Sequence, residues 1–236
     1  MKAVKLLNKR NTGILMSYFY TFLNMICGLF LSSFLLRMLG DTEYGIYQTI
    51  SSFAMYLVLL EFGTGTVLTR NILVIKNSGN SEKIKNVIST MSIITVLLAI
   101  VIMVISVIFY FSIDDIYANT MSAQQIIYGK KIFVVMTVYL VVSYFSQTLS
   151  GIALGMENYL FSQIVKIGNL ALRVILLVSV IWFNRQALMI AYIDVLLSII
   201  CFIVIYTYLK RVYKIQIRFK YFEFSILKES MPLCTA

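Results

Sequence analysis

The sequence of 236 residues contains no histidine, and only 13% of its side chains are charged. Histidine is the commonest general base, proton shuttle and transition-metal ligand, so acid–base catalysis here would have to rest on carboxylate, lysine or tyrosine side chains. The three cysteines, Cys27, Cys201 and Cys234, show no spacing typical of a zinc site or a disulfide framework, and we expect them to be small core residues. No nucleotide-binding loop, EF-hand or dinucleotide motif occurs, so we expect no cofactor, no metal site and no ATP hydrolysis.

Long apolar runs dominate the rest of the chain. Three of them contain no charged residue, and a fourth, 44–69, contains only Glu61. A hydrocarbon core about 30 Å thick requires roughly 20 apolar residues of helix, and runs without period-2 alternation favour helices over barrel strands. We therefore predict an all-α integral membrane protein with six transmembrane helices. The predicted spans are 11–36, 44–69, 86–113, 132–154, 159–184 and 187–209.

Lysine and arginine gather in alternate connections: the N-terminal tail, the break after the second span, and the tail after the sixth. These residues are Lys2, Lys5, Lys9, Arg10, Arg70, Lys76, Lys83, Lys85, Lys210, Arg211, Lys214, Arg218, Lys220 and Lys228. The positive-inside rule places all three segments, and both termini, in the cytoplasm. Because the net charge of +10 is split among juxtamembrane segments, we expect contact with anionic membrane lipids and none with nucleic acid.

Four charged residues fall within the predicted spans: Glu61, Lys166, Arg173 and Asp194. A charge inside a span costs roughly 2.5–3.5 kcal/mol on insertion scales, so it normally faces the bundle interior, a cavity or a partner. Lys166, Asn169 and Arg173 are spaced three and four residues apart, which places them on one helical face. The helix rise puts Arg173 within about one turn of Asp194, and Glu61 near the level of Lys166, so two salt bridges are feasible.

Two interpretations of these residues stay open. In one, buried ion pairs hold the helices together and bind no ligand. In the other, Lys166 and Arg173 line a water-filled cavity and attract an anionic head group, because arginine suits forked contacts with phosphate oxygens. Asn169, Asp194 and Glu61 are the further candidates for substrate binding in that cavity. We identify no catalytic residue.

Uncharged polar faces occur on the first, second and fourth spans. Small residues permit close helix approach, and amides and hydroxyls bond across helices, so packing explains most of these faces, with cavity lining as the alternative. The residues are Gly13, Ser17, Tyr20, Asn24 and Gly28, then Gln48, Ser52, Tyr56 and Gly63, then Tyr144, Gln147 and Gly151.

Three stretches share their order and spacing with a known family. They are Leu39-Gly40 followed by Glu43-Tyr44-Gly45-Ile46-Tyr47-Gln48, Leu60-Glu61-Phe62-Gly63 followed by Arg70, and Gly151-Ile152-Ala153-Leu154-Gly155-Met156-Glu157-Asn158-Tyr159 followed by Gln163 and Lys166. In these motifs the chain resembles the N-terminal half of the polysaccharide (O-antigen) flippases, the Wzx-like branch of the multidrug, oligosaccharidyl-lipid and polysaccharide exporter superfamily. The similarity covers nearly the whole chain.

The resemblance implies one lobe of a two-lobed transporter in the bacterial inner membrane, without enzymatic activity. It implies that lipid-linked (undecaprenyl-pyrophosphate) oligosaccharide crosses by alternating access. The implied partners are that substrate, a second lobe or another copy of the chain, and a polysaccharide polymerase as a further candidate. We expect residues 1–209 to form the lobe, and 210–236 a basic cytoplasmic linker and the start of a truncated seventh span. The first span lacks the arginine or proline that relatives often place there, so no ligand role is transferred to it.

Other functions stay open as alternatives. A membrane-embedded polysaccharide polymerase or transferase would normally need a long soluble loop with acid–base residues, whereas the connection 114–131 is short and poor in such groups. The membrane half of an ABC exporter would need cytoplasmic extensions that are missing here. A non-functional transporter fragment is the last alternative.

Overall fold

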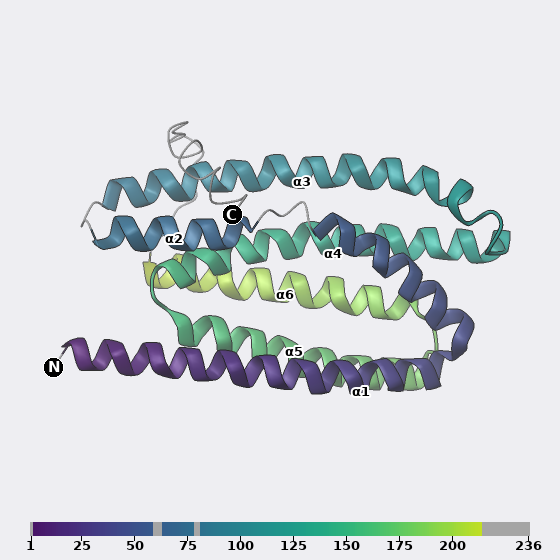
Figure 1. Cartoon of the computed structure of the whole chain (residues 1–236), viewed down its shortest axis with the longest axis horizontal. Coiled ribbons are helices and arrows are strands. Elements are labelled where there is room, and N and C mark those ends of the chain that lie inside the picture. The colour runs from purple at the N-terminus through teal and green to yellow at the C-terminus, as the bar shows by residue number, and fades with distance from the viewer. Residues whose placement is uncertain (1, 59–62, 78–80, 214–236) are drawn as a thin grey trace.

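The computed structural model describes residues 2–58, 63–77 and 81–213, and in these ranges the chain consists of helices joined by short turns, without strands. The helices run alongside one another, as Figure 1 shows, and five of them are long and apolar enough to cross a membrane. This confirms the predicted all-α membrane fold. The helices are α1 Lys2–Val58, α2 Thr64–Asn77, α3 Ser81–Tyr117, α4 Ala123–Gly155, α5 Tyr159–Phe183 and α6 Leu188–Tyr213.

Helix α1 reverses direction at Gly40. The backbone there has φ 80° and ψ 169°, a conformation that is essentially restricted to glycine. In Figure 1, α1 follows the length of the bundle, turns at one end and runs back across it. The first predicted span, 11–36, lies before this turn, and α1 also begins the second pass.

The second predicted span, 44–69, is divided between two helices. Its residues belong to the end of α1, which stops at Val58, and to the start of α2 at Thr64. Gly63, with φ 62°, is outside the helical range, and the Thr66 hydroxyl donates to its carbonyl oxygen at 2.6 Å. Hydrophobicity cannot reveal such a break, because it depends on a backbone angle that leaves the apolar pattern intact. Glu61 lies outside the described residues.

Helix α4 occupies the centre of the bundle and contacts every other helix. Its approach to α2 is unusually close, because a Cβ atom on Gly151 would lie 2.6 Å from the carbonyl oxygen of Gly65. The Thr69 hydroxyl donates to the Gly151 carbonyl oxygen at 3.0 Å, and the hydroxyls of Thr64 and Tyr144 lie 3.2 Å apart. Two residues of the predicted polar face of the fourth span, Tyr144 and Gly151, therefore serve helix packing.

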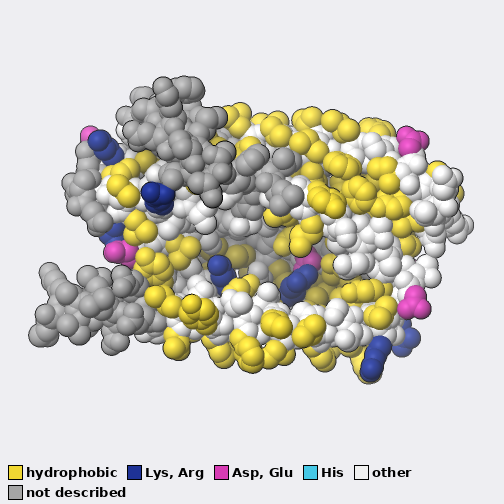
Figure 2. Space-filling model, viewed as in Figure 1, with side chains coloured by type: hydrophobic (Ala, Val, Ile, Leu, Met, Phe, Trp, Pro, Cys, Tyr) yellow, Lys and Arg dark blue, Asp and Glu magenta, His cyan; other side chains and the backbone are white. Residues whose placement is uncertain are grey.

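The predicted basic segments meet at one end of the bundle. The beginning of α1, the end of α2 with the beginning of α3, and the end of α6 lie together at the left of Figure 1. At that end Lys76 pairs with Glu157 at 2.5 Å, whereas Lys130 pairs with Asp114 at the other end. Figure 2 shows charged side chains at both ends and a mostly hydrophobic surface between them. Residues 214–236, which include the predicted seventh span, lie outside the described residues.

Candidate functional site

A pocket with a volume of about 260 Å³ opens between α1, α4, α5 and α6. Four residues that the sequence singled out line it: Lys166, Asn169 and Arg173 from α5, and Asp194 from α6. Figure 2 shows basic and acidic side chains in a hollow near the middle of an otherwise mainly hydrophobic face. The helix rise places Arg173 about 15 Å from the last residue of α5, so the pocket lies at the depth of the membrane.

Arg173 and Asp194 form a forked salt bridge inside this pocket. Arg173 Nε donates to Asp194 Oδ1 at 2.7 Å, and Arg173 Nη2 donates to Asp194 Oδ2 at 2.9 Å. The Asp194 side chain is only 10% exposed, whereas the Arg173 side chain is 40% exposed. This confirms the predicted pairing of the two spans and shows that, of the two charged groups that line the pocket, the guanidinium is the more exposed.

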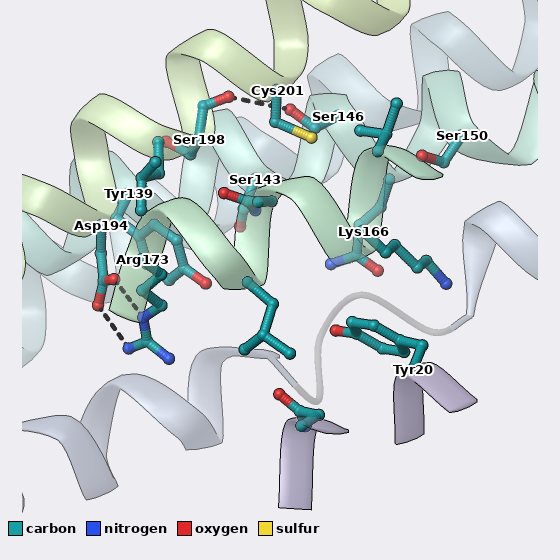
Figure 3. Close-up of a pocket in the computed structure, with 16 residues that line it drawn as sticks. Tyr20, Tyr139, Ser143, Ser146, Ser150, Lys166, Arg173, Asp194, Ser198 and Cys201 are labelled. Atoms are coloured by element: carbon teal, nitrogen blue, oxygen red, sulfur yellow. Dashed lines mark hydrogen bonds and ion pairs between the residues drawn. The ribbon is translucent and has the colours of Figure 1, made fainter. Parts of the chain in front are cut away.

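Lys166 is the second cation of the pocket, and its environment differs from that of Arg173. Its Nζ atom lies 5.9 Å from the centre of the Tyr20 ring, within cation–π range, and it forms no salt bridge with any described residue. Figure 3 shows Tyr20 on α1 close to the end of the Lys166 side chain. The predicted pairing of Lys166 with Glu61 stays a prediction, because Glu61 lies outside the described residues.

Uncharged polar groups, together with Val165, Leu170, Leu197 and Cys201, form the rest of the lining. Tyr20, Asn24 and Gln147 line the pocket. They belong to the polar faces for which packing was preferred and cavity lining was the alternative. Helix α4 adds a row of serines three and four residues apart, which face the pocket beside Tyr139 (Figure 3). This row was not predicted, although the three- and four-residue spacing of its serines is visible in the sequence. The serines are Ser143, Ser146 and Ser150.

Two cysteines differ from expectation. Cys27 and Cys201 are half-buried; Cys201 packs against the hydrophobic cluster that includes Ile205 and also lines the pocket, so neither is fully enclosed. Because thiols are small and weakly polar, sequence alone cannot separate a core position from a pocket wall. Cys234 lies outside the described residues.

The lining is suited to an anionic, hydrogen-bonding ligand. Two cations and one carboxylate give it a net charge of +1, and amide and hydroxyl groups surround them. Arginine and lysine both bind phosphate oxygens, arginine through its fork and lysine as a point charge. Among the described residues, no cluster of three or more His, Cys, Asp or Glu side chains could hold a metal ion.

Comparisons with known proteins identify the family and the fold of the chain. The sequence profile described as "Polysaccharide biosynthesis protein" matches residues 9–236. No curated protein matches the chain. Among solved structures, a point mutant of a MATE protein has a TM-score of 0.81 at 15% identity over 98% of this chain and 52% of its own. A MOP superfamily transporter from Pyrococcus furiosus has a TM-score of 0.78 at 15% identity, over 98% and 51%.

A third structure, an inward-facing multidrug resistance MATE family transporter of the MOP superfamily, has a TM-score of 0.70 at 17% identity, over 92% of this chain and 49% of its own. The chain thus spans about half the length of the solved structures it matches, and at these identities the likeness establishes the fold. The family profile matches nearly the whole chain, and the solved structures match its bundle of membrane-spanning helices over about half of their own length. The chain therefore belongs to the polysaccharide biosynthesis protein family and has the fold of half of a MATE transporter.

Proposed function

We propose that the chain is the N-terminal lobe of a flippase that carries lipid-linked (undecaprenyl-pyrophosphate) oligosaccharide across the bacterial inner membrane by alternating access. Its partners would be that substrate, surrounding membrane lipids, a second lobe or copy of the chain, and a polysaccharide polymerase acting after it. Family membership supports a role in polysaccharide biosynthesis, and the half-MATE fold supports transport. The observation that carries the proposal is a cationic pocket at membrane depth in a chain of this family.

The pocket supports an anionic head group as the part of the substrate that binds here. Intramembrane charges are costly, and Lys166 in particular has no carboxylate partner among the described residues to compensate it. A pyrophosphate would supply the negative charge that Lys166 lacks among the described residues. The volume of about 260 Å³ lies just below the usual range for drug-sized ligands, so it suits a diphosphate and its nearest groups rather than a whole oligosaccharide.

Replacing Lys166 with glutamine tests this assignment directly. Lys166 is exposed to the pocket and forms no salt bridge with a described residue, so its loss should leave folding intact while removing one cation. We expect complete lipid-linked repeat units to accumulate in the cytoplasmic leaflet at normal protein abundance. Lys85→Gln is the matched control, because Lys85 is an exposed lysine near the start of α3 and away from the pocket, and we expect it to behave as the wild type.

Three results would contradict the proposal. Repeat units that reach the outer leaflet without being polymerised would favour the polymerase or transferase alternative. Normal transport by Lys166→Gln would remove the pocket from the mechanism. Transport that persists after the gene for the chain is deleted would favour a non-functional fragment.

The proposed orientation has its own test. The basic end of the bundle should face the cytoplasm, because positive residues are retained on that side during insertion. Reporter fusions after Lys76 and after Lys210 should therefore both report a cytoplasmic location, and a fusion after Asn119 the opposite one. Fusions after Lys76 and Lys210 on different sides would refute the topology.

A further inference from the structure

The forked salt bridge occupies the side of Arg173 that an anionic ligand would use. Nε and Nη2 form the edge of a guanidinium that matches a carboxylate or phosphate, and both already donate to Asp194 at 2.7 and 2.9 Å. Figure 3 shows the remaining terminal nitrogen pointing away from Asp194. A ligand phosphate can therefore reach Arg173 only at the other edge, or by displacing Asp194.

Arg173 and Asp194 differ in how far their side chains are exposed, and this decides which of them a ligand can reach more easily. The Asp194 side chain is 10% exposed and the Arg173 side chain 40% exposed, so of the two pocket-lining residues Arg173 is the more open to a ligand. A phosphate bound to Arg173 would lie close to the Asp194 carboxylate, whose short side chain keeps it near α6. Like charges at such short range repel strongly at the effective dielectric of a partly buried site.

We propose that Asp194 competes with the anionic group of the substrate for Arg173. It holds Arg173 in place when no anion is bound, and it lowers the affinity of Arg173 for the substrate. This inference rests on the proposed function, because it assigns a regulatory role within the same pocket. Lys166, which lacks such a competitor among the described residues, makes the stronger first contact with the anion. Arg173 binds it with an affinity that Asp194 keeps low.

The consequence for transport concerns release. A carrier must bind its cargo well enough to capture it and weakly enough to let it go on the other side. A pocket with two uncompensated cations would retain a pyrophosphate, whereas one with a net charge of +1 binds it less tightly. Asp194 therefore favours turnover at the expense of affinity.

The test measures binding of inorganic pyrophosphate to the full chain in nanodiscs by calorimetry at fixed ionic strength. Asp194→Asn keeps the size of the side chain and its hydrogen-bonding oxygen but removes its charge. We expect its Kd for pyrophosphate to fall by about tenfold or more relative to the wild type. Adding Arg173→Gln to Asp194→Asn should abolish that gain, since the freed guanidinium is the cause.

A second readout covers the case in which Asp194→Asn purifies poorly. Cys201 lines the same pocket, so pyrophosphate should slow its alkylation in membrane vesicles. Half-maximal protection should occur at a lower pyrophosphate concentration in Asp194→Asn than in the wild type. This measurement needs no purified protein.

The outcomes separate this inference from the proposed function. If Lys166→Gln weakens binding but Asp194→Asn does not strengthen it, the competitor role is overturned and the pocket assignment stands. If neither the wild type nor Asp194→Asn binds pyrophosphate or protects Cys201, both are overturned. A gain in affinity that persists when Arg173 is also replaced would refute competition at Arg173.

Discussion

Replacing Arg173 with alanine should destabilise the chain more than replacing Asp194 with alanine, although the two substitutions remove the same salt bridge. The reason is the unequal exposure of the two side chains, 40% for Arg173 and 10% for Asp194. Arg173→Ala leaves a nearly buried carboxylate without its partner. Asp194→Ala leaves a guanidinium that can still be solvated from the pocket.

The magnitudes follow from the two limiting cases. Removing one partner of a buried pair costs about 3–5 kcal/mol, and the part-exposed geometry favours the lower end, so we expect about 3 kcal/mol for Arg173→Ala. An exposed pair contributes about 0–1 kcal/mol, so we expect about 1 kcal/mol for Asp194→Ala. The double variant leaves no unpaired charge, and we expect it to lose about 2 kcal/mol, less than Arg173→Ala alone.

Unfolding in mixed detergent and SDS micelles, followed by far-UV circular dichroism, gives the free energy of unfolding of each variant. The wild type and a Lys85→Gln variant provide the reference and the control for an unrelated charge. Equal losses for the two single alanine variants would refute the reasoning from burial. A double variant that loses the sum of the two single losses would show that the pair is not energetically coupled.

Three further predictions follow from single positions. Gly151→Leu should lower the free energy of unfolding by about 1–3 kcal/mol, because its Cβ would lie 2.6 Å from a backbone oxygen of α2. Gly28→Leu, with nothing within 4 Å of the added Cβ, should be nearly neutral. Unfolding in mixed micelles compares the two variants. Gly40→Ala should lower the free energy of unfolding by about 1–3 kcal/mol, because the residue has a positive φ. Gly45→Ala, in helical backbone with open space around it, should be neutral or stabilising. Equal effects of the two substitutions in the same assay would contradict the turn at Gly40. With the other cysteines changed to serine, Cys201 should react with a small water-soluble thiol reagent in membrane vesicles, and mass spectrometry showing no adduct would argue against a water-filled pocket.

Much of the helical architecture could be predicted because its cause is local. Uncharged runs of 20 or more residues must form helices in hydrocarbon, where peptide groups have no water to bond. The pairing of Arg173 with Asp194 could also be predicted, because helix rise converts sequence distance into depth and a charge at that depth needs a partner. The interruption at Gly63 could not be predicted, because it follows from a backbone angle that hydrophobicity does not encode.

Which residues line the pocket could likewise not be predicted from the sequence. Tyr20, Asn24 and Gln147 belong to polar faces that packing explains equally well, and the same kind of face on α4 contributes Gly151 to a tight helix contact. Which of these residues meets a neighbouring helix and which meets open space depends on the rotation of each helix about its axis. Side-chain spacing within one helix gives no measure of that rotation.

The sequence by itself determined that the chain crosses the membrane as helices, and that its basic segments gather at one end. These properties depend on the transfer of single segments from water to hydrocarbon, a local free energy that composition sets. Only the tertiary structure decided that α1 folds back at Gly40, that α4 takes the centre, and that Arg173 is more exposed in the pocket than Asp194. These depend on how closely whole helices pack, which arises from contacts between residues far apart in the chain.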